Sequence, residues 1–255
     1  MGRVPAKGKV AKLPSNFVCN ICGSACRSEV LDREIPSCDK CGSNVRFRWI
    51  VHALSTEIFG ESLLLKKFPK RKKIRGIGMS DSPQIADVLS SRFDYTNTSY
   101  HREPKFDITA PPQDDRGFDF IVASEVFEHV QPPVQDAFNN LAGLLSPAGF
   151  AIFSSPWELR GDTVEHFPGL NDWQVVHLRT GSVLLNRTAG GKLETFEDLN
   201  FHEGPGSTVE MRVFSRSGLL ANCAAAGFAR TSIAEDFTAF GIVWEAWSRG
   251  LVLRK

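Results

Sequence analysis

Two pairs of cysteines with metal-binding spacing stand near the N-terminus. Two residues separate Cys19 from Cys22 and Cys38 from Cys41, and fifteen residues lie between the pairs. Two such pairs place four thiolates tetrahedrally around one Zn²⁺, and a site with four thiolates keeps no open position for a substrate. The spacing therefore predicts a structural zinc site that folds this part of the chain. A fifth thiol, Cys26, could replace Cys22, but we interpret it as a spare.

A second group of chemically capable side chains is Glu125, Glu128 and His129. On the first turn of a helix, positions with this spacing share one face, so the three side chains could converge. Two carboxylates and an imidazole suit a divalent ion such as Mg²⁺ or Mn²⁺. His166, from a later polar connection, could complete the site.

The elements around Glu125 are those of an open α/β sheet. Residues 118–123 are a short apolar run, typical of a parallel strand buried on both faces, and residues 134–145 have apolar positions at helical spacing. A Ser-Pro-Ala-Gly sequence ends that helix, and residues 150–153 form the next buried strand. Glu125 would then lie at the carboxyl end of a strand, where such sheets bind ligands.

A glycine pair marks an earlier strand and its loop. Gly76 and Gly78, on either side of Ile77, would let the backbone approach a bound cofactor. The helix predicted at residues 83–92 begins with Ser82 as a cap and Pro83 at its first position. Residues 93–109 are expected to contain the second and third strands.

The stretch 118–157 closely resembles the fourth and fifth strands of class I S-adenosylmethionine-dependent methyltransferases, of the methyltransferase type 11-like kind. The resemblance implies an enzyme with a Rossmann-like α/β fold and a seven-stranded sheet. It also implies which residues contact S-adenosylmethionine. Gly76, Ile77 and Gly78 would contact its methionine part, Asn97 the ribose, and Asp107 and Ile108 the adenine. Ser124 and Glu125 would lie beside the cofactor.

The Glu-x-x-Glu-His sequence also resembles the metal site of small-RNA 2′-O-methyltransferases and of ubiquinone-pathway O-methyltransferases. In methyltransferases that need no metal, the histidine is structural and the first acid contacts the cofactor. Under that alternative, His166 or His129 is the general base. Two departures from the family pattern remain: Ile74 replaces the acid before the first glycine, and Ser80 replaces the third glycine.

Composition divides the chain into a basic tail, a zinc module, a linking helix and a methyltransferase domain. These cover residues 1–14, 15–45, 46–69 and 70–255, with a substrate-side insert at about 157–210. No apolar stretch is long enough to span a membrane and no signal-peptide core is present, so we expect a cytoplasmic protein without membrane contact. Disulfides are disfavoured in that compartment, which favours zinc.

These observations favour O-methylation of a small molecule or a glycan, with S-adenosylmethionine as cofactor. The net charge of +1 argues against binding nucleic acid through overall charge, whereas the basic tail and the zinc module leave RNA as an alternative substrate. The acid missing before Gly76 and the absence of the family's ribose-binding acid, where Asn97 stands, leave a third hypothesis, a scaffold protein that kept the fold without the activity. A nucleotide-dependent oxidoreductase is disfavoured because the first turn lacks a Gly-x-Gly-x-x-Gly sequence.

Overall fold

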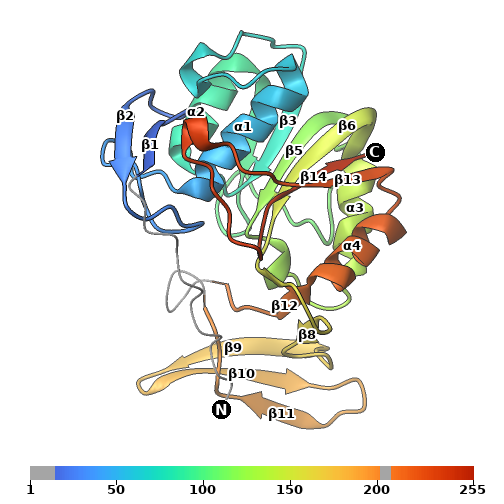
Figure 1. Ribbon diagram of the computed structural model, residues 1–255. Helices are drawn as coiled ribbons and strands as arrows, with labels where there is room; N and C mark the ends of the chain where they lie inside the picture. Colours follow the sequence, from blue (N-terminus) through green and yellow to red (C-terminus); the bar gives the residue numbers. More distant parts are fainter. Residues whose placement is uncertain (1–14, 202–207) are drawn as a thin grey trace.

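A computed structural model describes residues 15–201 and 208–255, so the basic tail lies outside the described residues. Its centre is a six-stranded sheet in the order β13-β14-β6-β5-β3-β4 (Figure 1). β4, β3, β5 and β6 run parallel, whereas β14 and β13 are antiparallel to their neighbours. The strands are β3 (Arg75–Met79), β4 (Asp94–Thr98), β5 (Phe118–Ser124), β6 (Leu145–Ser154), β13 (Arg230–Ile233) and β14 (Leu251–Arg254).

Four helices cover the two faces of this sheet, with α1 (Val45–Phe59) and α2 (Pro83–Arg92) on one face and α3 (Gln135–Leu144) and α4 (Arg216–Ala225) on the other (Figure 1). Successive side chains of β5 point to opposite faces of the sheet, which explains the two layers of helices. Phe120 and Val122 join the core with α1 and α2, and Ile121 and Ala123 join the core with α3 and α4. The predicted α/β fold class is confirmed.

The expected third strand does not form, and β4 is the only strand that the structure assigns between α2 and β5. The segment from residue 99 to 117 consists of turns and one isolated bridge between Ser99 and Lys105. It contains Pro104, Pro111 and Pro112, which lack the N–H group that a strand ladder needs. The described part of the central sheet therefore has six strands instead of seven.

The cysteine segment, residues 15–59, packs against this sheet through α1. It begins with a hairpin of β1 (Ser15–Val18) and β2 (Ala25–Ser28) and ends with α1. Asn44 caps α1 by accepting a hydrogen bond from the Phe47 N–H at 2.9 Å, and Gly60 ends it in the left-handed conformation. Residues of this segment belong to the same buried core as α2 and one face of β5.

The predicted insert forms two small sheets beyond the carboxyl edge of the central sheet (Figure 1). One contains β7 (Trp157–Glu158), β8 (Val164–Glu165) and β12 (Arg212–Ser215), and the other is the antiparallel meander of β9 (Asp172–Leu178), β10 (Gly181–Arg187) and β11 (Leu193–Phe196). A separate small core supports the meander. Three short 3₁₀ helices complete the fold: η1 (Leu65–Lys67), η2 (Phe127–His129) and η3 (Thr238–Phe240).

Within residues 15–201 and 208–255, no helix has the length and apolar character that crossing a bilayer would require.

Candidate active site

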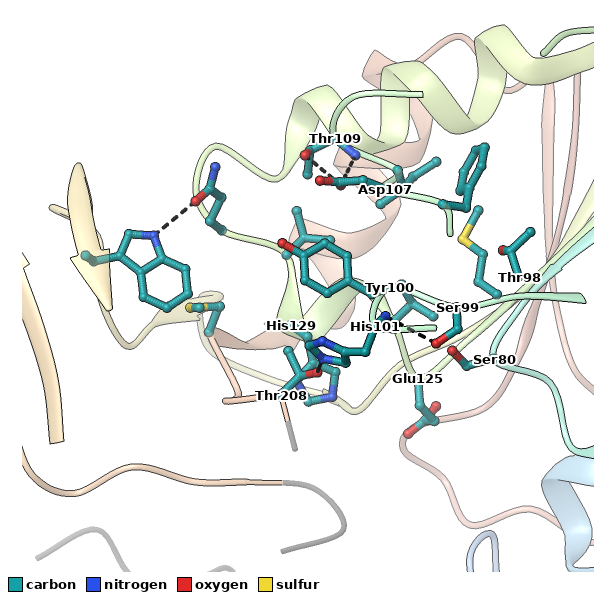
Figure 2. Close-up of a pocket in the computed structure, with 18 residues that line it drawn as sticks. Ser80, Thr98, Ser99, Tyr100, His101, Asp107, Thr109, Glu125, His129 and Thr208 are labelled. Carbon is teal, nitrogen blue, oxygen red and sulfur yellow. Dashed lines mark hydrogen bonds between the residues drawn. The ribbon is translucent and has the colours of Figure 1, made fainter. Parts of the chain in front are cut away.

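A pocket of about 220 Å³ lies at the carboxyl ends of β3, β4 and β5 (Figure 2). The chain passes from β3 to β4 on one side and then returns to β5 on the other, so the strand order reverses here. Open α/β sheets bind ligands at such a point. The pocket is lined by Met79, Ser80, Thr98, Ser99, Tyr100, His101, Phe106, Asp107, Ile108, Thr109, Glu125, Val126, His129, Val130, Gln131, Trp173, Thr208 and Met211.

The loop after β3 lies two residues later than the glycine pair suggested. β3 continues through Met79, and the turn falls at Ser80, whose φ is +64°. A Cβ at Gly76 would lie 2.2 Å from the Phe120 ring, and one at Gly78 would lie 1.9 Å from the Tyr95 hydroxyl. The two glycines therefore serve packing within the sheet. Gly76, Ile77 and Gly78 do not line the pocket, whereas Met79 and Ser80, which follow them, do.

Asn97 also does not line the pocket. Its amide accepts from the Asp81 N–H at 2.9 Å and donates to the Asp81 carbonyl at 3.0 Å. Asn97 thus fixes the loop that follows β3, and the neighbouring Thr98 and Ser99 provide the pocket wall expected from it. β3 and β4 are paired residue for residue, with Gly78 opposite Asn97 and Met79 opposite Thr98. In both strands the pocket residues therefore lie just after the predicted ones.

Asp107 and Ile108 do line the pocket (Figure 2). The Asp107 carboxylate accepts from the Thr109 N–H at 2.8 Å and the Thr109 hydroxyl at 2.7 Å, which holds the turn. The Ile108 carbonyl accepts from the Asn140 amide of α3 at 2.8 Å. A carboxylate and an aliphatic side chain are thereby fixed side by side in one wall.

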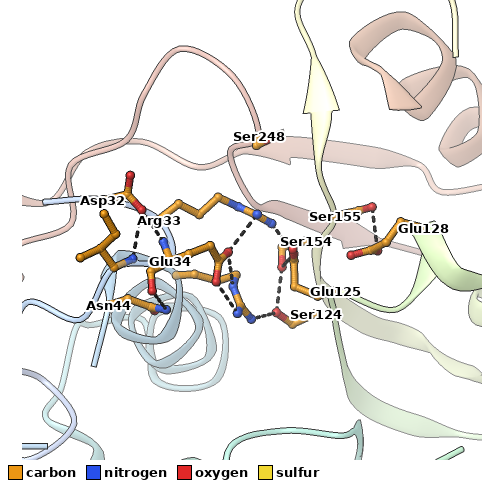
Figure 3. A network of polar contacts seen from close by, with 12 residues as sticks. Asp32, Arg33, Glu34, Asn44, Ser124, Glu125, Glu128, Ser154, Ser155 and Ser248 are labelled. Carbon is orange, nitrogen blue, oxygen red and sulfur yellow. Dashed lines mark hydrogen bonds and ion pairs between the residues drawn. The ribbon is translucent and has the colours of Figure 1, made fainter. Parts of the chain in front are cut away.

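Glu125 stands at the end of β5 with a φ of +57° and also lines the pocket. Its carboxylate pairs with the Arg33 guanidinium and accepts from the Ser154 hydroxyl at 2.8 Å (Figure 3). The adjacent Ser124 hydroxyl accepts from Arg46 at 2.7 Å. Burial raises the pKa of Glu125, but the charges of Arg33 and Arg46 outweigh burial and hold that pKa below its ordinary value. Glu125 is therefore an ionised carboxylate.

The other members of the predicted divalent site have partners elsewhere. The buried Glu128 carboxylate accepts from the Ser155 hydroxyl at 2.9 Å, away from Glu125 (Figure 3). His166 Nε2 lies 3.0 Å from the Glu210 carboxylate, and His166 is absent from the pocket lining. Within the described parts of the chain, the four cysteines are the single group of three or more candidate ligands that could hold a metal. The structure thus does not support a Mg²⁺ or Mn²⁺ site at Glu125, Glu128, His129 and His166.

His129 lines the pocket from η2. Its Nδ1 lies 3.0 Å from the Val209 carbonyl, which can only accept, so Nδ1 carries a proton and donates it to this carbonyl. Nε2 lies on the other side of the ring, 4.0 Å from the Glu128 carboxylate. Of the two histidines predicted as a base, His129 is the one at the pocket.

Sequence reasoning missed several residues around the pocket. His101 lies in the loop after β4, with Nε2 at 3.3 Å from the Thr208 hydroxyl, and Trp173 enters from β9 and donates to the Gln131 side chain at 3.1 Å. They come from a loop and from the insert, so no periodicity points to them. The sequence did not identify Arg33 as a partner of Glu125, or Arg46 as a partner of Ser124, because both arginines belong to the cysteine segment and are far from β5 along the chain.

The Sγ atoms of Cys19, Cys22, Cys38 and Cys41 all lie within 4.8 Å of one another. Each pair forms a tight turn, in which the N–H of Gly23 or Gly42 donates to the carbonyl of the first cysteine at 2.7 Å. These features fit a tetrahedral Zn²⁺ site.

Individual thiols in this cluster differ in acidity. Burial raises the pKa of Cys38, but hydrogen bonds from the Cys41 backbone and the Cys26 thiol outweigh burial and lower it to about 6. Cys26 lies outside the four-thiol group, and burial together with its bond to Cys38 raises its pKa to about 12. Cys38 is thus the thiol most ready to bind a metal.

Comparison with known proteins gives a family. A family model described as a methyltransferase domain matches residues 58–232, which is more than half of the chain. No curated protein matches the sequence.

Solved structures with a similar arrangement include three methyltransferases. An amino pentose methyltransferase of calicheamicin biosynthesis from Micromonospora echinaspora is 14% identical with a TM-score of 0.39, and the match covers 71% of this chain and 82% of that one. A sugar N-methyltransferase from Streptoalloteichus sp. is 12% identical with a TM-score of 0.43 (81% and 85% covered). The 1,6-didemethyltoxoflavin-N1-methyltransferase of Burkholderia thailandensis is 13% identical with a TM-score of 0.40 (81% and 76%). At these scores the likeness identifies no substrate.

Proposed function

This chain belongs to the methyltransferase family whose domain matches residues 58–232, and we propose that it transfers a methyl group from S-adenosylmethionine to a hydroxyl of a small molecule or a glycan. The observation that carries the proposal is the pocket at the strand-order reversal. Its walls combine an aliphatic and aromatic surface, a carboxylate on each side, and a histidine.

The pocket residues suit the three parts of this cofactor. Phe106 and Ile108 offer an apolar surface for the adenine, and the adjacent Asp107 carboxylate would accept from its amino group. Thr98 and Ser99 would hold the ribose hydroxyls. The ionised Glu125 would face the positively charged methionine part, which favours a cation at that end.

Methyl transfer needs alignment of the acceptor with the sulfonium methyl and exclusion of water. The bound cofactor supplies the electrophilic methyl group. Trp173 and Met211 close the side of the pocket toward the insert. With its proton fixed on Nδ1, His129 would take the acceptor hydroxyl's proton on Nε2. No divalent ion is needed for this assignment.

The four cysteines would hold a structural Zn²⁺, because two tight turns bring four thiols together and no fifth ligand position remains. The RNA alternative depended on the zinc module and on the basic tail, and the tail lies outside the described residues. The scaffold hypothesis depended on the missing acids, yet Asp107 and Glu125 still place carboxylates in the pocket wall.

Calorimetric titration of S-adenosylmethionine into the purified protein tests the proposal. We expect micromolar affinity, and we expect Asp107→Ala to weaken it about tenfold, as the loss of a hydrogen bond to a charged group would. Asp114→Ala, which removes an exposed carboxylate from the same connection, is the matched control. Absence of binding by the wild-type protein would refute the proposal.

A turnover screen then identifies the acceptor. Release of S-adenosylhomocysteine with hydroxyl compounds, amines and RNA is compared in parallel. Turnover with amines or RNA and none with hydroxyl compounds would refute O-methylation while leaving the cofactor assignment intact.

A further inference from the structure

Two arginines of the cysteine segment reach the carboxyl end of β5, next to the pocket. Arg33 lies between the two cysteine pairs and binds the Glu125 carboxylate (Figure 3). It also pairs with Glu34 at 2.9 Å. Arg46, in the first turn of α1, holds the other Glu34 oxygen at 2.7 Å and donates to Ser124 at 2.7 Å. The chain segment that contains the cysteines therefore supplies part of the polar lining behind the pocket wall.

The backbone around Arg33 is fixed by the same structure that forms the cysteine cluster. The Asp32 carbonyl accepts from the Val45 N–H at 3.2 Å, and the Arg33 carbonyl accepts from the Arg46 N–H at 3.3 Å, so this loop covers the open N-terminus of α1. The Ser37 N–H donates to the Ser43 carbonyl at 3.0 Å, across the turn that carries Cys38 and Cys41. The loop that carries Arg33 and the turn that carries Cys38 and Cys41 are thus held at the same end of α1.

The charges in this network are balanced, and all but Glu34 are largely withdrawn from water. Arg33 and Arg46 face Glu34 and Glu125, and the Arg33 and Glu125 side chains are 12% and 18% exposed, whereas Glu34 is 47% exposed. Removing one partner of such a pair leaves the other charge desolvated and unpaired, so the remaining group moves or becomes neutral. Glu125 alone among the four lines the pocket.

We propose that Arg33 is a positioning residue of the methyltransferase site: it holds the Glu125 carboxylate in the pocket wall, and it couples metal binding at the four cysteines to binding of S-adenosylmethionine. The inference rests on the proposed function, since Glu125 would face the positively charged methionine part. Coupling of this kind is reciprocal, so the cofactor must tighten zinc binding by the same factor as zinc tightens cofactor binding.

The first experiment compares cofactor affinity in metal-loaded variants by calorimetry. Arg33→Met is expected to weaken binding of S-adenosylmethionine at least about tenfold, and Arg33→Lys, which keeps the charge, should recover part of that loss. The control is Arg27→Met, an exposed arginine on β2 of the same segment, which should bind as the wild type does. Zinc content and melting temperature are measured for each variant, and Arg33→Met should retain its zinc.

The second experiment measures zinc affinity by competition with a chromophoric chelator, with and without S-adenosylmethionine. In the wild type the cofactor should tighten zinc binding, and in Glu125→Gln, an uncharged residue of the same shape, this effect should disappear. Each zinc affinity is compared with and without cofactor in the same folded protein. The measurement therefore tests the coupling even if Arg33→Met folds poorly.

The outcomes are distinct. If the wild type binds no S-adenosylmethionine, the proposed function fails. If the wild type binds it, while Arg33→Met binds equally well or Glu125→Gln keeps the full zinc effect, the proposed function stands and the coupling is overturned.

Discussion

Asp81, the residue after Ser80, should lose its proton as pH rises, and this ionisation should lower the free energy of unfolding. Its carboxyl group is buried beside Gly78 and accepts a hydrogen bond from the Tyr95 hydroxyl. Burial raises the pKa of Asp81 to about 7, although the Tyr95 hydrogen bond and the charge of Arg46 oppose this. At neutral pH the carboxyl group is therefore divided between its two protonation states.

The sign of the effect follows from the two pKa values. The folded protein keeps a proton on Asp81 up to about pH 7, whereas the unfolded chain releases it near the ordinary value of 3.8. The contribution of the neutral carboxyl group to stability is complete below about pH 4 and is lost as pH rises through about 7. At about 1.4 kcal/mol per pH unit, the interval between the two values corresponds to an upper limit of about 4 kcal/mol.

The perturbation is Asp81→Asn, which keeps an oxygen acceptor for Tyr95 and cannot ionise. We expect urea unfolding below about pH 4 to show similar stability for both proteins, and at about pH 8 to show the variant more stable by as much as about 4 kcal/mol. Any zinc bound by the cysteines would depend on pH in the same way in both proteins, so the difference between them isolates Asp81. Asp87→Asn, an exposed carboxylate on α2, should show no such trend. A difference between wild type and Asp81→Asn that stays constant with pH would refute the reasoning.

Two further predictions concern the cysteines and the general base. Cys38→Ser should lose zinc, measured by metal analysis, and melt at a lower temperature, because Cys38 has the lowered pKa and belongs to the shared core; Cys26→Ser should keep one zinc per chain. Equal zinc content in both variants would contradict the four-thiol assignment. His129→Gln should leave binding of S-adenosylmethionine unchanged and lower the rate of methyl transfer about a hundredfold, measured by S-adenosylhomocysteine release. An unchanged rate would remove His129 as the base.

Patterns of apolar residues along the sequence predicted those elements in which one face must pack against a continuous core. The apolar run at β5 and the periodicity of α3 each have one solution, because a shift of one residue would expose apolar side chains. The region between α2 and β5 carried no such constraint. Its prolines and charged residues allow turns as readily as a strand, and the expected third strand is absent there.

Residues that the sequence singled out line the pocket where they follow directly from the end of a strand or lie in its connecting loop, as at Asp107 and Glu125. The sequence did not reveal that Gly78 is required by the Tyr95 side chain on the next strand, a contact that only the folded sheet shows. Arg33 was beyond reach for the same reason, since it is separated from Glu125 by 92 positions and meets it only through the packing of α1.

The packing of the cysteine segment argues that it is part of the catalytic domain and not an appended module. Arg48 of α1 is fully buried, donates to the Gly241 carbonyl near the C-terminal strands at 2.9 Å, and lies over the Phe17 ring of β1. A Cβ at Gly250 would lie 2.3 Å from the Trp49 ring, so the chain leading into β14 is shaped to this helix. An independently folding module would not need such contacts with the far end of the chain. A metal ion bound by the cysteines would therefore stabilise the same core that supports the pocket, and Arg33 gives this core a direct connection to Glu125.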